Sequence, residues 1–441
     1  AGQGSVIEAY HQRHGAIPSS VPPVKLVATA VVLGSGGSGG REGPMAQIGA
    51  GLASAIARAL HLGPVDRRLA VVAGLGAGIG AIFRAPLGGA LLATEVLYLE
   101  GLEIEALIPT FIATIVAFSI YTAWAGGTPV FGPHPGITFQ EPASLLFYAA
   151  LGVACGLVGI AYIRSLLVTE ALFRRLRLPL PLKPALGGLL VGLLALALPQ
   201  VLGMGYGWAQ LAMESAALPL ALLALLLVGK VVATALTVGS GGSAGVFGPG
   251  IVVGGLLGAA LWRALAPLWE AVPDVPAAAV LVGMMALVGA VAHAPLAVMV
   301  MVAEMAGSYA LLPAAMVAVG LAYLVVGRHT IFPTQLPNPA ASPAHRGEYA
   351  YPLLNRVPVR EAMRVDVVRV RPETPVAEAA RLMRRWQIKG LPVVEAGGPL
   401  VGIVTNLDVV QVPRERWEEV QVREVMSTDL VVAHSDDPLD F

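Results

Sequence analysis

The pattern of apolar positions divides the chain into a long apolar part and a short alternating part. From about residue 24 to about residue 327, apolar stretches recur with few charges between them, for example the stretches that start at Leu218, Ala277 and Leu311. A straight helix needs about 20 apolar residues to cross the core of a bilayer. Several stretches are shorter or are interrupted by glycine and proline, so the pattern predicts a polytopic membrane domain with tilted or broken helices.

Beyond Val359 the pattern changes to that of a small mixed domain. The alternating segments "DVVRVRP" from Asp366 and "LPVVE" from Leu391 predict strands. "TPVAEAARLMRRWQ" predicts an amphipathic helix, with Thr374 as N-cap and Pro375 as its first residue. The charge distribution supports the same boundary, because 14 of the 28 acidic residues lie after Val359. We therefore expect a water-soluble domain attached to the membrane domain.

Composition excludes several classes of protein. With 56% hydrophobic and 13% charged residues, the chain lacks the surface charge of a soluble protein of this size, and its net charge of zero gives no reason to expect a nucleic acid partner. The one cysteine, Cys155, excludes a disulfide framework, and the eight histidines show no metal-ligand spacing. The chain opens within a glycine motif, "AGQGSVIEAY", which favours a missing N-terminal part.

The apolar part contains an internal repeat. "KLVATAVVLGSGGSGGREGP", residues 25–44, aligns without a gap on "KVVATALTVGSGGSAGVFGP", residues 230–249, with 13 of 20 positions identical. A second pair of matching segments follows, and each contains Ala-Pro-Leu and a later glutamate, Glu95 in the first copy and Glu304 in the second. The membrane domain is therefore predicted to be two copies of one unit.

The duplicated glycine loops favour an anion site. Glycine-rich backbone can turn sharply and leave unpaired N–H groups at the start of the next helix, which carries about half a positive charge. Irregular backbone at membrane depth is tolerated only where it lines a cavity, and glycine-broken helices in matching positions of two repeats mark transporter sites. Two such loops that face each other would bind a permeating anion weakly enough for it to leave.

Nucleotide-loop readings of the first repeat do not fit. Gly34, Gly36 and Gly39 match the GxGxxG dinucleotide fingerprint, but the acidic residue expected about 20 positions later is missing, since Asp66 lies further away. A Walker loop fails because Gly-Arg stands where Gly-Lys-Ser/Thr is required. A flexible linker would not keep the flanking apolar sequence in register with its copy.

At these residues the chain resembles the CLC family of chloride channels and chloride/proton antiporters. The resemblance rests on "GREGP" (40–44), "GVFGP" (245–249) and the opening "AGQGSVIEA", and it extends from the start of the chain to about Leu336. It implies an all-α polytopic membrane protein with an inverted-type internal repeat and broken helices. The family's helices that precede the first motif are missing from this sequence.

The resemblance implies that Glu42 is the external gating glutamate, which accepts a proton, with Gly40, Arg41 and Gly43 around the anion. The residue's chemistry agrees, because a carboxylate in a dry anion site mimics chloride and protonation removes the charge that holds it there. The alternative is an ordinary acid that complements the first turn of a helix.

In the second motif, the resemblance implies that the backbone amides of Gly245, Val246 and Phe247 face the anion, so that the Phe247 ring has no chemical role. Two departures from the family weaken the site. The family's chloride-coordinating serine falls on Ala1 if "VIEA" is aligned, or near residues 3–5 if the glycines are, and its coordinating tyrosine corresponds to Phe332. Under the better alignment, on Ala1, the serine hydroxyl is lost, and Phe332 lacks the hydroxyl of the tyrosine. Weak anion binding is therefore expected, and tight proton coupling is not.

The position that follows Glu95 also departs from some antiporters. Val96 stands where those proteins have an internal proton-transfer glutamate, but channels and other antiporters share this loss. The preceding Glu95 matches an acidic residue common in the family. We interpret Glu95 as structural, a carboxylate that accepts backbone hydrogen bonds.

The C-terminal part resembles a CBS pair, with "VREAM" at Val359 returning as "VREVM" at Val422. Thr405 and Asp408 in "GIVTNLD" match positions that contact phosphate and ribose in nucleotide-binding members. An adenine nucleotide is therefore a candidate ligand, while a structural or dimerising role without a ligand is equally open. The second module stops before its fold is complete.

The predicted organisation is a transport domain over residues 1–338 (repeat units about 1–125 and 145–338), a linker over 339–357, and a cytoplasmic CBS region over 358–441, with modules at about 358–412 and from about 420. We expect a homodimer in the plasma or inner membrane that requires no cofactor and is not an enzyme, since paired catalytic carboxylates, a metal cluster and a nucleophile with its base are all missing. Its expected activity is proton-coupled antiport of chloride or a similar small anion. A passive channel or uncoupled carrier is the main alternative; a nucleotide-dependent membrane enzyme and a regulatory scaffold are less consistent with the duplicated loops.

Overall fold

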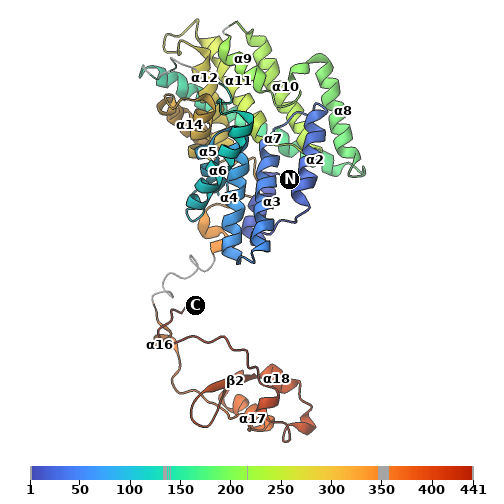
Figure 1. Ribbon diagram of the computed structural model, residues 1–441, viewed down its shortest axis with the longest axis vertical. Helices are drawn as coiled ribbons and strands as arrows, with labels where there is room; N and C mark the ends of the chain where they lie inside the picture. The colour runs from blue at the N-terminus through green and yellow to red at the C-terminus, as the bar shows by residue number, and fades with distance from the viewer. Residues whose placement is uncertain are drawn as a thin grey trace. The chain divides into compact units, whose positions relative to one another are not determined.

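The computed structural model describes residues 2–132, 137, 139, 141–215, 217–345 and 357–439, and it divides into two compact units, Ala1–Arg346 and Gly347–Phe441 (Figure 1). Each unit has its own hydrophobic core. Ala1, residues 346–356 of the predicted linker and the last two residues lie outside the described residues.

The first unit is helical. Its first half contains α1 (Gln3–Gln12), α2 (Val21–Gly34), α3 (Glu42–Ala59), α4 (Pro64–Phe83), α5 (Pro86–Glu95) and α6 (Leu107–Ala125). Its second half contains α7 (Ser144–Arg175), α8 (Leu182–Ala197), α9 (Tyr206–Glu214), α10 (Leu220–Gly239), α11 (Phe247–Leu265), α12 (Pro276–Val291), α13 (Pro295–Ala306) and α14 (Leu312–Val326), with short 3-10 turns η1 (Pro199–Val201), η2 (Pro339–Ala341) and η3 (Pro343–His345).

Many of these helices are too short to cross a bilayer. Among the described residues, four helices are long and apolar enough to do so: α6, α7, α10 and α11. Proline occupies the first or second position of α2, α4, α5, α12, α13 and α14, where its missing N–H removes no helical hydrogen bond. The prediction of broken and shortened helices is confirmed.

The two sequence repeats make reciprocal contacts. The hydroxyl of Thr29 in the first copy hydrogen-bonds that of Ser243 in the second at 3.0 Å, and Thr234 in the second copy bonds Ser38 in the first at 3.2 Å. Both the two threonines and the two serines lie 205 positions apart. Each contact is therefore the counterpart of the other, as expected for two copies related by an approximate twofold axis.

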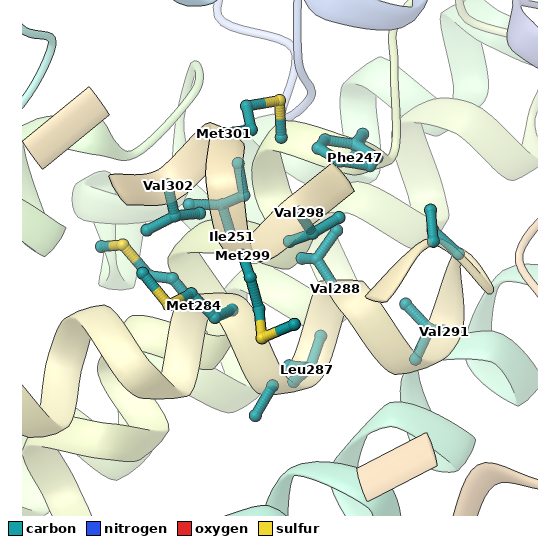
Figure 2. Packing of buried hydrophobic residues seen from close by; sticks show 14 of the residues in the cluster. Phe247, Ile251, Met284, Leu287, Val288, Val291, Val298, Met299, Met301 and Val302 are labelled. Carbon is teal, nitrogen blue, oxygen red and sulfur yellow. The ribbon is translucent and has the colours of Figure 1, made fainter. Parts of the chain in front are cut away.

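Every residue of α12 is buried in the core of the first unit. α12 packs against α7, α11, α13 and α14. Figure 2 shows part of this cluster, in which Met284, Leu287 and Val288 of α12 lie among side chains of α11 and α13. A helix that is apolar all round is buried on all sides, which explains why this 16-residue segment has no polar face.

Residues 339–345, which the sequence analysis assigned to the linker, are held to the first unit. The Oγ atom of Ser342 hydrogen-bonds Nδ1 of His11 at 2.8 Å, and Nε2 of His345 lies 2.9 Å from Oε2 of the buried Glu103. The same carboxylate oxygen accepts hydrogen bonds from the hydroxyls of Tyr10 (2.5 Å) and Tyr98 (2.6 Å). This buried cluster therefore fixes the end of the first unit to α1.

The second unit contains α16 (Val359–Ala362), α17 (Val376–Trp386), α18 (Asn406–Val410) and an antiparallel pair of strands, β1 (Gly390–Val394) and β2 (Leu400–Thr405), with 3-10 turns η5 (Arg414–Arg416) and η6 (Val422–Glu424). The strand predicted at "LPVVE" is confirmed as β1, and the predicted helix is present but begins one residue late, with Pro375 as its N-cap. The two "VRE" copies form short helical turns, α16 and η6.

The strand predicted at 366–372 is wrong except for one bridge, a parallel pairing of Val370 with Val393. Val370 N–H donates to Pro392 O, and Val394 N–H donates to Val370 O. The next bond on one side would need the N–H of Pro392, and the next on the other side that of Pro372. Proline lacks this donor, so the ladder stops in both directions.

Candidate functional site

The two glycine loops meet directly. Gly40 N–H donates to Gly245 O at 2.8 Å, and Gly245 N–H donates to Gly40 O at 2.7 Å, which forms an isolated antiparallel bridge. The bridge joins equivalent positions of the two repeats, 205 residues apart. The prediction that the loops face each other agrees with this arrangement.

A helix starts immediately after each half of the bridge. α3 begins at Glu42 with Arg41 as its N-cap, and α11 begins at Phe247 with Val246 as its N-cap. The hydroxyl of Tyr162 donates to Val246 O at 2.6 Å and fixes the start of α11. The first N–H groups of a helix have no partner within it and favour a negative charge. Two such helix ends therefore converge on one small region.

The carboxylate of Glu42 occupies this region. Its side chain is 1% exposed, its Oε1 accepts a hydrogen bond from the hydroxyl of Tyr206, and its Oε2 has no hydrogen-bond partner among the described residues. Oε2 lies against Gly40 and against Gly248 in the first turn of α11, where an added Cβ would come within 2.6 Å of it. Any larger residue at either glycine would exclude the carboxylate from this place.

A cavity of about 500 Å³ opens beside the bridge. Four residues of the predicted anion site line it: Gly43, Gly245, Val246 and Phe332. The other described residues of that prediction are not among its lining residues: Gly40, Arg41, Glu42 and Phe247. The cavity therefore reaches the bridge and the α11 N-cap, while Glu42 lies beyond its lining.

The remaining wall of the cavity carries polar groups. Arg174 and Lys183 contribute positive charge and Glu8 and Glu170 negative charge. Gln3 also lines the cavity, is 3% exposed, and has no hydrogen-bond partner for its Nε2 amide. Such an unsatisfied buried donor is costly unless an acceptor reaches it.

The hydroxyl of Ser5, one of the residues considered for the family's serine, is already engaged. It donates to Gly2 O at 2.8 Å and accepts a hydrogen bond from Nε2 of Gln47, also at 2.8 Å. Ala1, the other position considered, lies outside the described residues. Ser5 is therefore held at the first turn of α1 by a side chain of α3.

The rings of Phe247 and Phe332 lie in different surroundings. Phe247 is 1% exposed and packs among apolar side chains, with its ring centre 5.8 Å from that of Phe83. Figure 2 shows it in the same cluster as Ile251 and Val298. Phe332 is 4% exposed and borders the cavity, where its ring offers no hydroxyl.

Three residues of the site were not selected from the sequence. Tyr206 contacts Glu42, Tyr162 holds the start of α11, and Lys230 donates from Nζ to Gly203 O at 2.6 Å, close to the start of α9. A signal existed only for Lys230, which is identical in both copies of the repeat as Lys25 and Lys230. The two tyrosines stand alone in apolar or glycine-rich segments.

Glu95 accepts backbone hydrogen bonds, as predicted. Its Oε1 and Oε2 accept hydrogen bonds from Leu296 N (3.3 Å) and Ala297 N (2.8 Å) at the start of α13. In the other copy, Glu304 accepts hydrogen bonds from two backbone N–H groups at the start of α5, Leu87 N (3.2 Å) and Gly88 N (2.8 Å). Each repeat therefore caps a helix of the other.

Comparison with protein families decides the identity of the chain. The family model described as "Voltage gated chloride channel" matches residues 1–327, and the CBS domain model matches residues 359–415. The chain belongs to the CLC family. This is a family of channels and transporters rather than of enzymes.

Relatives and solved structures agree with the CLC assignment. The chain is 34% identical over 312 residues to a "Putative chloride channel protein ClcB-like" of Ralstonia nicotianae, over 70% of this chain and 72% of that protein. Its fold is similar to that of a slow cyanobacterial Cl−/H+ antiporter (TM-score 0.67, 25% identity, 75% of this chain and 79% of the other). It is also similar in fold to a CLC-type fluoride/proton antiporter (TM-score 0.68, 24% identity, 76% and 82%). The predicted fold class is confirmed.

The predicted nucleotide-contacting pair of the CBS region forms a helix cap. The backbone N–H and the hydroxyl of Thr405 both donate to Oδ2 of Asp408, at 2.7 and 2.8 Å, at the start of α18. Both side chains are therefore engaged with each other. Their contact with an adenine nucleotide stays a prediction.

Proposed function

We propose that this CLC protein transports chloride or a similar small anion in exchange for protons, with Glu42 as its gate. The observation that carries the proposal is the carboxylate of Glu42, buried beside the first turn of α11 where the two glycine loops pair. A buried carboxylate needs compensation for its lost hydration. The Tyr206 hydroxyl, the partial positive charge of helix N-termini and the nearby positive charges of Arg41 and Lys230 supply this compensation.

The mechanism follows from competition for one place. In the charged form, Glu42 fills the position at the start of α11 as an anion would. Protonation removes the charge, so the side chain loses its preference for this position and an anion replaces it. Because the proton and the anion each displace the charged carboxylate, movement of one is linked to movement of the other.

The cavity at the bridge supports an anion route to this position. It is lined by Gly43 in the first turn of α3 and by Gly245 and Val246 just before α11, so residues at both helix starts border it. Backbone amides bind an anion without a full positive charge, and such binding is weak enough to permit release. Chloride and protons are thus the proposed substrates, and no cofactor enters the mechanism.

Two residues favour the alternative of a passive channel or an uncoupled carrier. Phe332 borders the cavity without a hydroxyl, and Val96, which is fully buried, offers no carboxylate. Both features favour a passive channel or an uncoupled carrier. In that case Glu42 opens and closes the anion pathway, but its movement does not carry a proton across the membrane.

The assembly and cellular setting are part of the proposal. We place the protein as a homodimer in the plasma or inner membrane, with one anion pathway in each subunit and the CBS region in the cytoplasm. An adenine nucleotide at the CBS region belongs to the same proposal. Deleting the residues after Val357 tests the scaffold alternative, which predicts that transport is lost with the CBS region; the transport proposal predicts that it persists.

The test is simultaneous recording of chloride and proton movement in liposomes that contain the full chain, beside Glu42→Gln and the exposed control Glu105→Gln. We expect a chloride gradient to drive protons uphill in the wild type and in Glu105→Gln, and Glu42→Gln to abolish only the proton movement. Chloride flux without protons in the wild type would establish the uncoupled alternative. No anion flux in any variant would overturn the proposal.

A further inference from the structure

Tyr206 donates a hydrogen bond to the Glu42 carboxylate from outside both glycine loops. It is the first residue of α9, and its hydroxyl donates to Oε1 of Glu42. Its ring lies edge-on to that of Phe131, with ring centres 5.7 Å apart. Among the described residues, no side-chain hydroxyl of either glycine loop donates a hydrogen bond to this carboxylate.

The segment before α9 is held to the first glycine loop and to α10, which fixes the position of Tyr206. Gly203 O accepts hydrogen bonds from Nζ of Lys230 (2.6 Å) and from the N–H of Gly39 in the first glycine loop (3.2 Å). Lys230 also donates to Val201 O at 3.2 Å and is 2% exposed. Gly205 turns the chain into α9 with a φ of 89°, a conformation that favours glycine. The tyrosine hydroxyl is therefore positioned by the framework rather than by Glu42.

When the Glu42 side chain leaves its position, the Tyr206 hydroxyl stays there as a hydrogen-bond donor. If the Glu42 carboxylate departs, the Tyr206 hydroxyl loses its acceptor inside a site that is otherwise lined by helix N-termini. An unsatisfied buried donor is costly, and a charged acceptor restores a stronger hydrogen bond than a neutral one. The other oxygen of the same carboxylate, Oε2, has no hydrogen-bond partner among the described residues, so the side-chain hydrogen bond to Glu42 comes from Tyr206.

We infer that the Tyr206 hydroxyl is a ligand of the transported anion at the position that Glu42 vacates. The ligand class is a small monovalent anion that accepts hydrogen bonds, such as a halide. Tyr206 thereby supplies, at the Glu42 position, the kind of hydroxyl donor that Phe332 cannot supply at the cavity. The inference rests on the proposed function, because it requires Glu42 and the anion to alternate in one place.

Chloride binding to the full chain in detergent, measured by isothermal titration calorimetry, tests the inference. Glu42→Ala vacates the position, and the comparison is Glu42→Ala/Tyr206→Phe with Glu42→Ala/Tyr309→Phe, since Tyr309 is an exposed tyrosine at 49%. We expect removal of the Tyr206 hydroxyl to weaken chloride binding about 10- to 100-fold, as for loss of one hydrogen bond to a charged group. The Tyr309 control is expected to bind as tightly as Glu42→Ala.

The outcomes separate the inference from the proposed function. Equal affinity in the two double variants would overturn the role of Tyr206 and leave anion transport intact. Absence of chloride binding in Glu42→Ala together with absence of anion flux in the wild type would overturn both.

If Glu42→Ala/Tyr206→Phe does not fold, a transport measurement on the single variant Tyr206→Phe tests the same inference. With Glu42 intact, Tyr206→Phe is expected to raise the chloride concentration needed for half-maximal flux while the maximal rate changes little. A lower maximal rate at an unchanged half-saturating concentration would indicate a merely structural role and would overturn the inference.

Discussion

Replacing the two reciprocal capping glutamates tests whether the repeats are held together as equivalent halves. Each carboxylate accepts two hydrogen bonds from backbone N–H groups at the start of a helix in the other copy: Glu95 caps α13 and Glu304 caps α5. A hydrogen bond to a charged group contributes about 1.5–3 kcal/mol, and the helix dipole adds about 0.3–2 kcal/mol. Glutamine keeps one acceptor oxygen but loses the charge and turns an NH₂ group toward the second N–H.

We therefore expect Glu95→Gln and Glu304→Gln each to destabilise the first unit by about 2–3 kcal/mol, and Glu95→Gln to have the larger effect. Glu95 is 6% exposed and Glu304 is half-buried, so water replaces the lost bonds more readily at Glu304. The corresponding fall in the thermal midpoint is about 3–4 °C for a unit of this size.

The assay is thermal unfolding of the purified full chain in detergent, with Glu105→Gln as an exposed control that is expected to behave as wild type. A large shift in one capping variant and none in the other would refute the equivalence of the two halves. No shift in either would refute the energetic role of the caps.

Two further substitutions test the site and its support. Gly248→Ala places a methyl group where the Glu42 carboxylate lies, so anion flux is expected to lose most of its pH dependence. The control Gly250→Ala, whose added methyl group would meet only side chains at 3.2 Å or more, is expected to keep it. Equal pH profiles of the two variants would contradict this. Glu103→Gln weakens an acceptor that two tyrosines and a histidine share. It is expected to lower the free energy of unfolding by about 2–4 kcal/mol, measured by thermal or denaturant unfolding, while the control Glu105→Gln changes it little. A wild-type unfolding midpoint in Glu103→Gln would show that the cluster does not hold the unit together.

The main features of the site could be predicted because they are encoded twice. A gapless repeat of 20 residues with glycines and a Pro in matching positions predicts two equivalent turns, and the bridge between Gly40 and Gly245 joins those turns. Glu42 stands out since it is a carboxylate at the first position of the helix that follows one turn. Its counterpart in the other copy, Phe247, is apolar and lies in the core.

The contacts that complete the site depend on residues far apart in the chain. Tyr206 lies 164 positions from Glu42, in a segment whose composition indicates only a turn followed by a helix. No periodicity or local motif reports which hydroxyl reaches a buried carboxylate, because that is decided by the packing of α9 against α11 and α12.

The C-terminal unit shows the same limit in its backbone. Alternation at 366–372 predicts a strand, but whether it pairs depends on the residues of the strand beside it. Proline at 392 and at 372 removes the two donors that would extend the ladder on either side of Val370. The alternating pattern of residues 366–372 therefore cannot show that the neighbouring strand has a proline at the pairing position.

The central claim is that the Glu42 carboxylate and the transported anion occupy the same position. It is tested most directly by equilibrium chloride binding to the purified full chain over a range of pH, for the wild type and for Glu42→Gln. The account predicts that the chloride affinity of the wild type falls as pH rises, because the charged carboxylate competes, and that the affinity of Glu42→Gln stays constant. A wild-type affinity independent of pH, or the same pH dependence in Glu42→Gln, would contradict it.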